Sequence, residues 1–189
     1  MNRDSFVSLF LERVAEPAIA QGYRFVGGSQ TLAYCAGDAT VALIRLGGKW
    51  AAPGSIAHIL CARHRFLRTL IAEAVPEADT LSVSDYPYKW RPSSLFGIPP
   101  NQWRYSPSNL GHWEHDRLEY GEQDERTTRE AVDRLLQLLV KPATEWAAML
   151  SPERGLADLQ HLGEGAWCER LWIEDYEARL ANSGRAVQQ

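Results

Sequence analysis

The chain has 189 residues, of which 45% are hydrophobic and 23% are charged, and its formal net charge at pH 7 is −4. A chain of this length buries a sizeable core without disulfides, and its seven Trp, seven Tyr and five Phe argue against a disordered protein. The cysteines at 35, 61 and 168 are too scattered for a disulfide scaffold. The first 20 residues contain charges that interrupt any signal peptide or membrane span. We therefore expect a cytoplasmic protein with no membrane contact.

Charge is divided unevenly along the chain. Residues 1–110 carry 11 basic and 8 acidic side chains, a net of +3, whereas residues 111–189 carry 9 basic and 16 acidic side chains, a net of −7. An acidic surface repels the phosphates of nucleic acids and attracts basic proteins. We expect no nucleic-acid partner, and the acidic part is either a solvated helical surface or a site for a basic protein.

The first third of the chain predicts a helix followed by a β-meander. Apolar residues recur at helical spacing over 4–20, and Pro17 and Gly22 should mark the end of that helix. Three short runs, 23–26, 31–35 and 40–46, are separated by glycine-containing turns, which indicates antiparallel strands. Residues 55–61 predict a fourth strand that leads into a helix over 64–75, which Pro76 would end.

Residues 76–110 contain six of the ten prolines, so few regular hydrogen bonds are expected there. A short strand is predicted near 81–85, and the alternation over 113–120 predicts one more. The two glycine pairs, at 27–28 and 47–48, match no phosphate-binding pattern and are interpreted as turns.

From Thr127 the apolar period becomes helical. Thr127 and Glu130 fit a capping box, and Pro142 should kink or break the helix that follows. Ser151 followed by Pro152 predicts the start of a short helix, and a last helix is expected over 166–180. The order of elements predicts an α+β fold in which an antiparallel meander sheet is covered by an N-terminal helix and a C-terminal helical segment. We expect a single domain, 1–189, comprising a sheet part over 1–122, a helical part over 123–182 and a frayed tail over 183–189.

Two short segments offer candidate chemistry. His112 and His115 flank Glu114, but residues three apart in a strand point to opposite faces, so no metal site is expected. The segment Cys61-Ala62-Arg63-His64-Arg65 places a thiol, an imidazole and guanidiniums together, which would suit a nucleophile or an anion-contacting corner. The alternative is that Cys61 is a small buried core residue. No cofactor is implied, and an enzyme is less expected than a binding protein.

The most distinctive stretch is a proline-stiffened aromatic loop over 86–105. Its candidate binding residues are Tyr86, Tyr88, Trp90, Arg91, Trp103, Arg104 and Tyr105. Aromatic and Arg side chains on a stiff loop bind partners at low entropic cost. The same rings would equally serve to pack over the sheet and close the core, and the sequence leaves both interpretations open.

Several segments together carry a family resemblance. "QGYRF", the glycine-punctuated meander, "CARHRFLR", "DYPYKWRPSSL" and the acidic helical C-terminus resemble small bacterial α+β proteins classed as domains of unknown function. Some proteins of this build accompany toxin systems as immunity factors. The resemblance implies an architecture and a bacterial source, and it assigns no functional residue and no cofactor.

The sequence therefore favours a bacterial binding protein that acts by stoichiometric protein contact, in the manner of an immunity or antitoxin-like factor. Its expected partner is a basic protein, its oligomeric state is left open, and the acidic contact residues would include Glu169, Glu174 and Glu177. The competing hypothesis is a small enzyme or ligand-binding domain whose site lies near the 86–105 loop and uses Cys61, Arg63 or His64.

Overall fold

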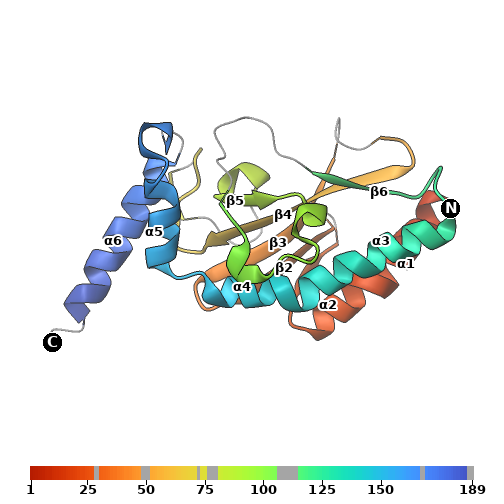
Figure 1. Ribbon diagram of the computed structural model, residues 1–189, viewed down its shortest axis with the longest axis horizontal. Coiled ribbons are helices and arrows are strands. Elements are labelled where there is room, and N and C mark those ends of the chain that lie inside the picture. The colour runs from red at the N-terminus through yellow and green to blue at the C-terminus, as the bar shows by residue number, and fades with distance from the viewer. Residues whose placement is uncertain are drawn as a thin grey trace.

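A six-stranded antiparallel sheet forms the centre of the computed structural model (Figure 1). The structure describes residues 1–27, 30–47, 52–71, 73–75, 81–105, 115–166 and 169–186. The strands are β1 (Arg24–Val26), β2 (Thr31–Ala36), β3 (Ala39–Leu46), β4 (Ser55–His64), β5 (Tyr88–Trp90) and β6 (Asp116–Glu119). The order β1-β2-β3-β4 follows the chain, so the meander predicted from the glycine-separated runs is confirmed.

The ten-residue strand β4 organises this sheet. One of its edges pairs with β3 along eight registered residue pairs, from Ala39 opposite His64 to Leu46 opposite Ala57. Its other edge is shared by two short strands, β6 along 55–58 and β5 along 60–62. All ten residues of β4 are buried, because both edges are paired and both faces are covered.

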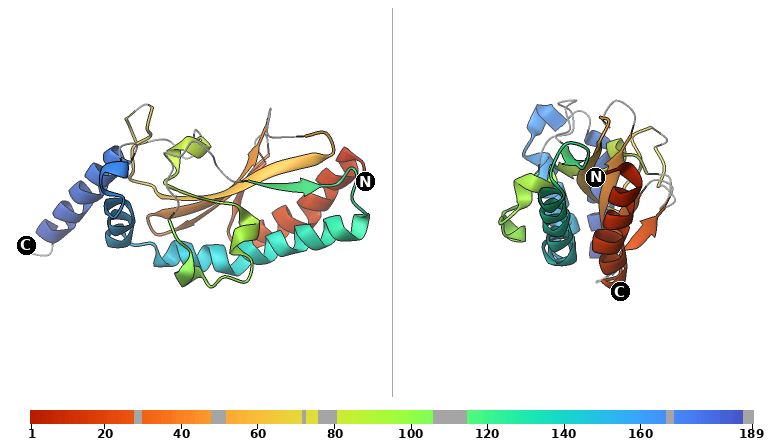
Figure 2. Two further views of the ribbon diagram at one scale, coloured as in Figure 1. Left: turned by 45° about the horizontal axis from the view of Figure 1, so that its top comes forward. Right: turned by 90° about the vertical axis from the view of Figure 1, so that its right-hand side faces the viewer.

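Helices cover one face of the sheet and one end of the molecule. They are α1 (Arg3–Phe10), α2 (Glu16–Ala20), α3 (Glu125–Leu138), α4 (Thr144–Met149), α5 (Pro152–Gln160) and α6 (Arg170–Ala186). Helices α1 to α4 run along the same side of the sheet, whereas α5 and α6 stand at the end away from the N-terminus (Figures 1 and 2). The predicted α+β class is confirmed, with the N-terminal helix and the C-terminal helical segment in the expected places.

The main core lies between the sheet and helices α1 to α4. A row of directly opposed large residues crosses five strands on this side of the sheet, which we call the helix face. This row is Phe25, Leu32, Leu43, Leu60 and Trp90. It packs in one cluster with the apolar stripes of the helices, including Phe6 and Leu9 of α1 and Val132 and Leu135 of α3. Burial of such side chains contributes about 1.5 to 3 kcal/mol each.

The two internal prolines of the long helical segments lie in a wide helical turn or directly after one. A π-helical turn, Leu11–Ala15, joins α1 to α2, and a second, Leu139–Ala143, joins α3 to α4. Pro17 lies in the first turn of α2 and does not end the N-terminal helix, which corrects that prediction. Proline lacks a backbone N–H, and π turns are a common way for a helix to absorb such a disruption. Pro142 disrupts its helix as predicted, inside the second π turn.

The helix predicted over 64–75 is wrong. Strand β4 continues to His64, and the next residues form turns. Their backbone groups bind side chains from distant elements, since the Arg68 N–H donates to Asp175 Oδ2 at 2.7 Å and the Arg68 carbonyl accepts from Trp172 Nε1 at 3.0 Å. The apolar spacing that suggested a helix instead places Leu67 in a cluster with α5 and α6.

Two predictions in the proline-rich part also change. The strand expected near 81–85 is a 3₁₀ turn, Val83–Asp85, because the side chains of Ser82 and Asp85 form a capping box. The strand β5 was not predicted. Its three residues lie between Pro87 and Pro92, which leaves enough free backbone donors to pair with β4.

The starts of the C-terminal helices follow their capping side chains. Asp124, not Thr127, is the N-cap of α3, because its carboxylate accepts from the Thr127 N–H at 3.0 Å. Ser151 caps α5 as predicted, with Pro152 in the first turn. Helix α6 begins at Arg170 and continues to Ala186, beyond the predicted end at 180.

The contact between α5 and α6 yields a stability prediction. A Cβ on Gly155 of α5 would overlap the ring of Tyr176, which is fully buried and hydrogen-bonded to His64. Gly155→Ala should therefore lower the free energy of unfolding by about 1 to 3 kcal/mol, measured by urea denaturation. Gly184→Ala, in an exposed turn of α6 with no atom near the added Cβ, should be neutral or stabilising. Equal effects of the two substitutions would contradict the packing described.

Candidate functional site

The face of the sheet opposite α1 to α4, which we call the far face, has a floor of small side chains. The register places one row of directly opposed residues across five strands on this face. The row is Arg24, Ala33, Ala42, Cys61 and Lys89. Its three central members are small and its two end members are basic. The adjacent row on the helix face consists of large residues, so side-chain volume differs between the faces along this row. Farther along the same strands, Leu46 and Ile59 of the far face pack with Val83 in a smaller apolar cluster.

A second row on the far face adds polar groups. Cys35 lies opposite Thr40, and Thr40 lies opposite Arg63. Cys35 is exposed, and its Sγ lies 3.5 Å from the hydroxyl oxygen of Thr40. The two rows border a pocket of about 290 Å³, which we call the arginine pocket. It is lined by Gly22, Arg24, Ala33, Cys35, Thr40, Arg63, Arg65, Leu81 and Tyr86.

Among the described residues that line the arginine pocket there are three guanidiniums and no carboxylate. The most constrained of the three is Arg63, which is 1% exposed. Its Nε donates to the His64 carbonyl at 3.1 Å, its Nη1 donates to the Asp85 carbonyl at 2.8 Å, and its Nη2 donates to the Leu67 carbonyl. These three bonds fix the guanidinium at the end of β4 and tie the strand to the two segments that flank the pocket.

The charge of Arg63 is not neutralised by a direct ion pair within the described part of the chain. Burial lowers the pKa of Arg63 from its ordinary value, and Tyr86 and Asp85 oppose this effect. A guanidinium nevertheless remains protonated in proteins. The pocket therefore holds a buried positive charge whose hydrogen bonds go to neutral carbonyls, an arrangement that favours an anion nearby.

Arg65, a second arginine of the pocket, is much more exposed than Arg63. Its Nη2 donates to the Gly37 carbonyl at 2.8 Å and lies 3.8 Å from Asp38. The same carboxylate accepts a shorter bond, 2.6 Å, from Arg179 of α6. Asp38 is thus shared by a pocket arginine and an arginine of the last helix, and it stays paired if Arg65 turns toward the pocket.

Tyr86 forms part of the wall of the arginine pocket. It is 3% exposed, and burial raises the pKa of its hydroxyl above the ordinary value, so the group remains a neutral donor and acceptor. Within the described residues its hydroxyl has no hydrogen-bond partner in the protein. Among the candidates from sequence, Arg63 and Tyr86 are the two that the structure brings together here.

Cys61 and His64 do not form a catalytic pair. Because β4 runs through both residues, side chains three positions apart point to opposite faces. Burial raises the pKa of the Cys61 thiol to about 12, so it stays protonated at neutral pH. On the other face, His64 Nε2 lies 3.0 Å from the Leu150 carbonyl and its Nδ1 lies 2.8 Å from the Tyr176 hydroxyl. A carbonyl only accepts, so Nε2 carries the proton and Nδ1 accepts from Tyr176.

The aromatic loop packs down as a lid on the core. Tyr86, Tyr88, Trp90 and Trp103 are each less than 10% exposed. The Trp90 ring meets the Trp146 ring of α4 edge to face at 4.8 Å, and Trp90 Nε1 donates to the Arg104 carbonyl at 2.8 Å. Of the seven candidate binding residues in this loop, only Arg91, Arg104 and Tyr105 reach the surface, and Arg104 is the most exposed of them. The second of the two interpretations left open by the sequence is therefore the one that the structure shows.

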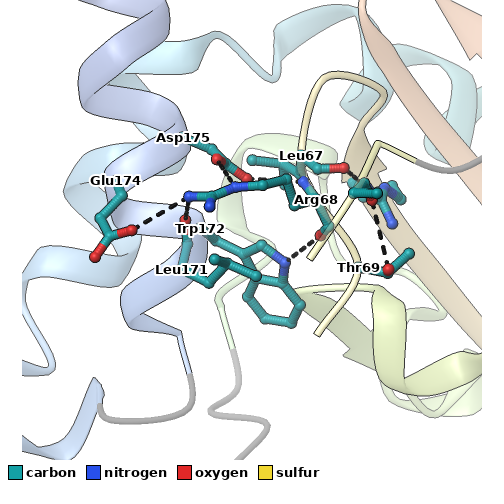
Figure 3. Close-up of polar contacts among 9 residues, drawn as sticks. Leu67, Arg68, Thr69, Leu171, Trp172, Glu174 and Asp175 are labelled. Atoms are coloured by element: carbon teal, nitrogen blue, oxygen red, sulfur yellow. Dashed lines mark hydrogen bonds and ion pairs between the residues drawn. The ribbon is translucent and has the colours of Figure 1, made fainter. Parts of the chain in front are cut away.

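The three acidic candidates lie in different environments. Glu169 is fully buried and accepts from the Tyr105 hydroxyl at 2.8 Å, so it is not part of an acidic surface. Glu174 lies 3.2 Å from the Arg68 guanidinium, which also donates to Asp175 at 2.5 Å (Figure 3). Glu177 is exposed and accepts a weak 3.4 Å bond from Gln160. Of the three, Glu177 is the most available to a partner.

Four polar residues of the pocket lining were missed by the sequence analysis: Arg24, Cys35, Thr40 and Arg65. The predicted strands contain the first three, and their alternation assigns Arg24 and Cys35 to the face opposite Phe25 and Tyr34. What was lacking is the register, which follows only when the lengths of the turns between the strands are known. Arg65 was quoted with its segment, but the helix expected there placed it on no particular face.

A second pocket lies on the helix face, near the end of the sheet formed by β6. It has a volume of about 410 Å³, and its lining includes His58, Ser93, Asp116 and Arg134. His58 Nδ1 is buried without a hydrogen-bond partner, and burial lowers the pKa of His58 to about 4, with Asp116 opposing the shift. The charges around this pocket are mixed, so it indicates no ligand class, in contrast to the arginine pocket.

Comparison of the chain with protein-family models, with curated proteins and with solved structures finds no match. The resemblance to immunity-like bacterial proteins therefore stays a prediction. In the described ranges, no helix has the length and apolar character needed to cross a bilayer. No group of three or more potential metal ligands occurs among the same residues, and His112 of the histidine pair lies outside them.

The buried histidines predict a dependence of stability on pH. Burial lowers the pKa of both His58 and His64 from 6.5 to about 4. Between those values the unfolded chain binds protons that the native state does not, so the free energy of unfolding should fall as the pH is lowered from 6.5 toward 4. Each histidine contributes up to about 1.4 kcal/mol per pH unit in this window.

Urea denaturation between pH 7 and pH 4.5 measures this slope. His64→Gln should reduce the slope even though it also lowers the stability at pH 7, because it removes the imidazole that is buried against Tyr176 and Leu150. A slope that does not respond to loss of His64 would show that this imidazole is not buried in its neutral form.

Proposed function

We propose that this chain binds a small anionic molecule in the arginine pocket. The observation that carries the proposal is the lining of that pocket, whose described residues include three arginines and no carboxylate around a floor of small side chains. A volume of about 290 Å³ suits a metabolite-sized ligand rather than a large cofactor. The pocket lies near the segment and the loop that the sequence analysis named for a ligand site, with Arg63 and Tyr86 in its wall.

The proposal is for binding rather than catalysis. The pocket contains one exposed thiol, Cys35, whose neighbours across the strands are a hydroxyl and a guanidinium. A nucleophile needs a base within hydrogen-bond reach. The described part of the lining contains no imidazole and no carboxylate, and His64 lies on the other face of β4. Recognition of an anion needs only the charges and donors that are present.

A pocket-filling variant tests this proposal. Cys35→Trp places a large ring in the arginine pocket from an exposed strand position, where an aromatic residue is well tolerated. We expect a panel of carboxylated and phosphorylated metabolites to contain at least one that raises the melting temperature of the wild type. At ten times its Kd, such a ligand stabilises by about 1.4 kcal/mol, roughly 3 to 5 °C for a chain of this size. Cys35→Trp should abolish the shift.

Arg104→Gln is the matched control, because it removes an exposed arginine outside the pocket. It should leave the shift unchanged. The proposal is contradicted if no anion of the panel stabilises the wild type, or if the stabilisation survives in Cys35→Trp.

A second proposal keeps the protein-contact hypothesis, for a bacterial cytoplasmic factor that binds a basic protein. The specific observation in its favour is that the distal part of α6 projects beyond the rest of the molecule (Figure 1). Four exposed acidic residues lie in α5, in α6 or in the turn between them: Glu153, Glu164, Glu174 and Glu177. Their field would speed association with a basic surface.

Charge reversal tests this second proposal. Glu177→Lys should slow association with a stoichiometric partner captured from the host several-fold at low salt, with little effect at high salt, as measured by surface plasmon resonance. Glu122→Lys, at the far end of the molecule next to α3, is the control. Unchanged association of Glu177→Lys would remove α6 from any electrostatic contact.

A further inference from the structure

The hairpin between β2 and β3 contributes an exposed thiol to the arginine pocket. Cys35 lies near the end of β2, directly opposite Thr40 of β3, and both residues line the pocket. Arg65 is tied to the same hairpin, because its backbone N–H donates to the Asp38 carbonyl at 2.7 Å and its Nη2 donates to the Gly37 carbonyl at 2.8 Å. One short turn therefore holds a guanidinium of the pocket close to the strand end that carries the thiol.

Two buried polar side chains of the pocket retain hydrogen-bonding capacity. Tyr86 is 3% exposed and lines the pocket, and its hydroxyl forms no hydrogen bond with the described part of the chain. It lies near enough to both Cys35 and Arg63 to interact with them electrostatically. Arg63 uses three of the five guanidinium N–H groups on backbone carbonyls. A buried hydroxyl without a partner is costly, so this group marks a position that a polar ligand atom would fill.

The pocket thus presents cations, neutral hydrogen-bonding groups and a thiol to one ligand. Guanidiniums bind carboxylates and other oxygen anions. A thiol reacts with a disulfide through its thiolate, and this exchange needs no neighbouring base. Resting on the proposed anion-binding function, we propose that Cys35 is a modification site at which an anionic low-molecular-weight disulfide forms a mixed disulfide with the protein.

The exchange balances without a further oxidant. The thiolate of Cys35 attacks one sulfur of the bound disulfide, a bond forms between Sγ and that sulfur, and the S–S bond of the ligand breaks. The second sulfur leaves as a thiolate and takes up one proton from water, which replaces the proton that Cys35 released. Cys35 is oxidised and half of the ligand is reduced to a thiol. Binding of the anionic group by Arg63 and Arg65 raises the effective concentration of the disulfide at the thiol.

The mixed disulfide is stable against attack by the other described cysteine. Cys61 is fully buried, and burial raises the pKa of its thiol to about 12, so this thiol stays protonated at neutral pH. The adduct should therefore persist until an external thiol removes it. Because the retained half of the ligand occupies the arginine pocket, the modified protein should no longer bind a free anion there.

The rates of adduct formation with three disulfides of similar length test the proposal. 3,3′-Dithiodipropionate is anionic, bis(2-hydroxyethyl) disulfide is neutral and cystamine is cationic. Intact-protein mass spectrometry measures each rate, peptide mapping locates the adduct, and division by the rate of the same disulfide with N-acetylcysteine amide removes intrinsic reactivity. We expect the normalised rate at Cys35 to be about tenfold higher for the anionic disulfide than for cystamine. Equal normalised rates, or an adduct mapped only to another cysteine, overturn the proposal.

Variants and a competitor show whether the reaction passes through the pocket. Arg65→Gln should slow the reaction of the anionic disulfide about fivefold and leave that of cystamine no slower, and Arg65→Lys should restore most of the rate. Arg104→Gln, outside the pocket, is the matched control and should change neither rate. Suberate has two methylenes in place of the two sulfurs of the anionic disulfide, so it should slow the reaction as an unreactive competitor. A reaction that responds to neither Arg65→Gln nor suberate contradicts the proposal.

The outcomes separate this proposal from the function on which it rests. Stabilisation by an anion of the panel that is lost in Cys35→Trp, together with equal normalised rates for the three disulfides, overturns the mixed disulfide and leaves anion binding intact. Absence of any stabilising anion, together with no competition by suberate, overturns both. Preference for the anionic disulfide, with competition by the best anion of the panel, supports both.

Discussion

The ten residues of β4 are buried on both faces of the sheet, and the two faces contribute to separate apolar clusters. On the helix face, Leu60 lies in a row of large residues that fills the space beneath α1 to α4. On the far face, Cys61 lies in a row with two other small residues, Ala42 and Ala33. Alternation along a strand makes the two faces independent. The protein therefore has its main core on one side of the sheet and a smaller apolar cluster beside the arginine pocket on the other.

Arg63 links the arginine pocket to the rest of the fold. Its guanidinium binds carbonyls of the turn after β4 and of the 3₁₀ turn before β5, so the walls of the arginine pocket are held by the same charge that the pocket presents. The turn after β4 is in turn held to α6 by Arg68 and Asp175. One network of hydrogen bonds thus fixes the position of α6, the walls of the pocket and the buried guanidinium of Arg63.

Local patterns predicted the elements better than their environments. Glycine-punctuated apolar runs predicted β1, β2 and β3, and Ser151 with Pro152 predicted the start of α5, because turns and caps are decided by neighbouring residues. The turn after β4 was missed because its backbone groups at Leu67 and Arg68 bind the side chains of Arg63, Asp175 and Trp172. Two of these three partners, Asp175 and Trp172, are distant in the sequence. Tertiary partners of this kind leave no local signal.

The candidate site shows the same division. Arg63 and Tyr86 were named from sequence as candidates, and both line the arginine pocket. The acidic Glu169 and the rings of Trp90 and Trp103 looked equally suited to binding, yet they are buried. Hydropathy and charge do not distinguish an aromatic lid from an aromatic binding surface, because the same rings serve both. Placing Arg24 on the same face of the sheet as Arg63 requires the register of three strand pairs, β1 with β2, β2 with β3 and β3 with β4.

The most direct test of the account is the location of an anion on the protein. A titration of ¹⁵N-labelled protein with the anion of the panel that most raises the melting temperature, followed through backbone amides and arginine Nε–H groups, reports that location residue by residue. The account predicts shift changes at Arg24, Ala33, Cys35, Thr40 and Arg63, with α5 and the second pocket at His58 unaffected. Changes centred on His58 and Arg134, or on the acidic residues of α6, would contradict it.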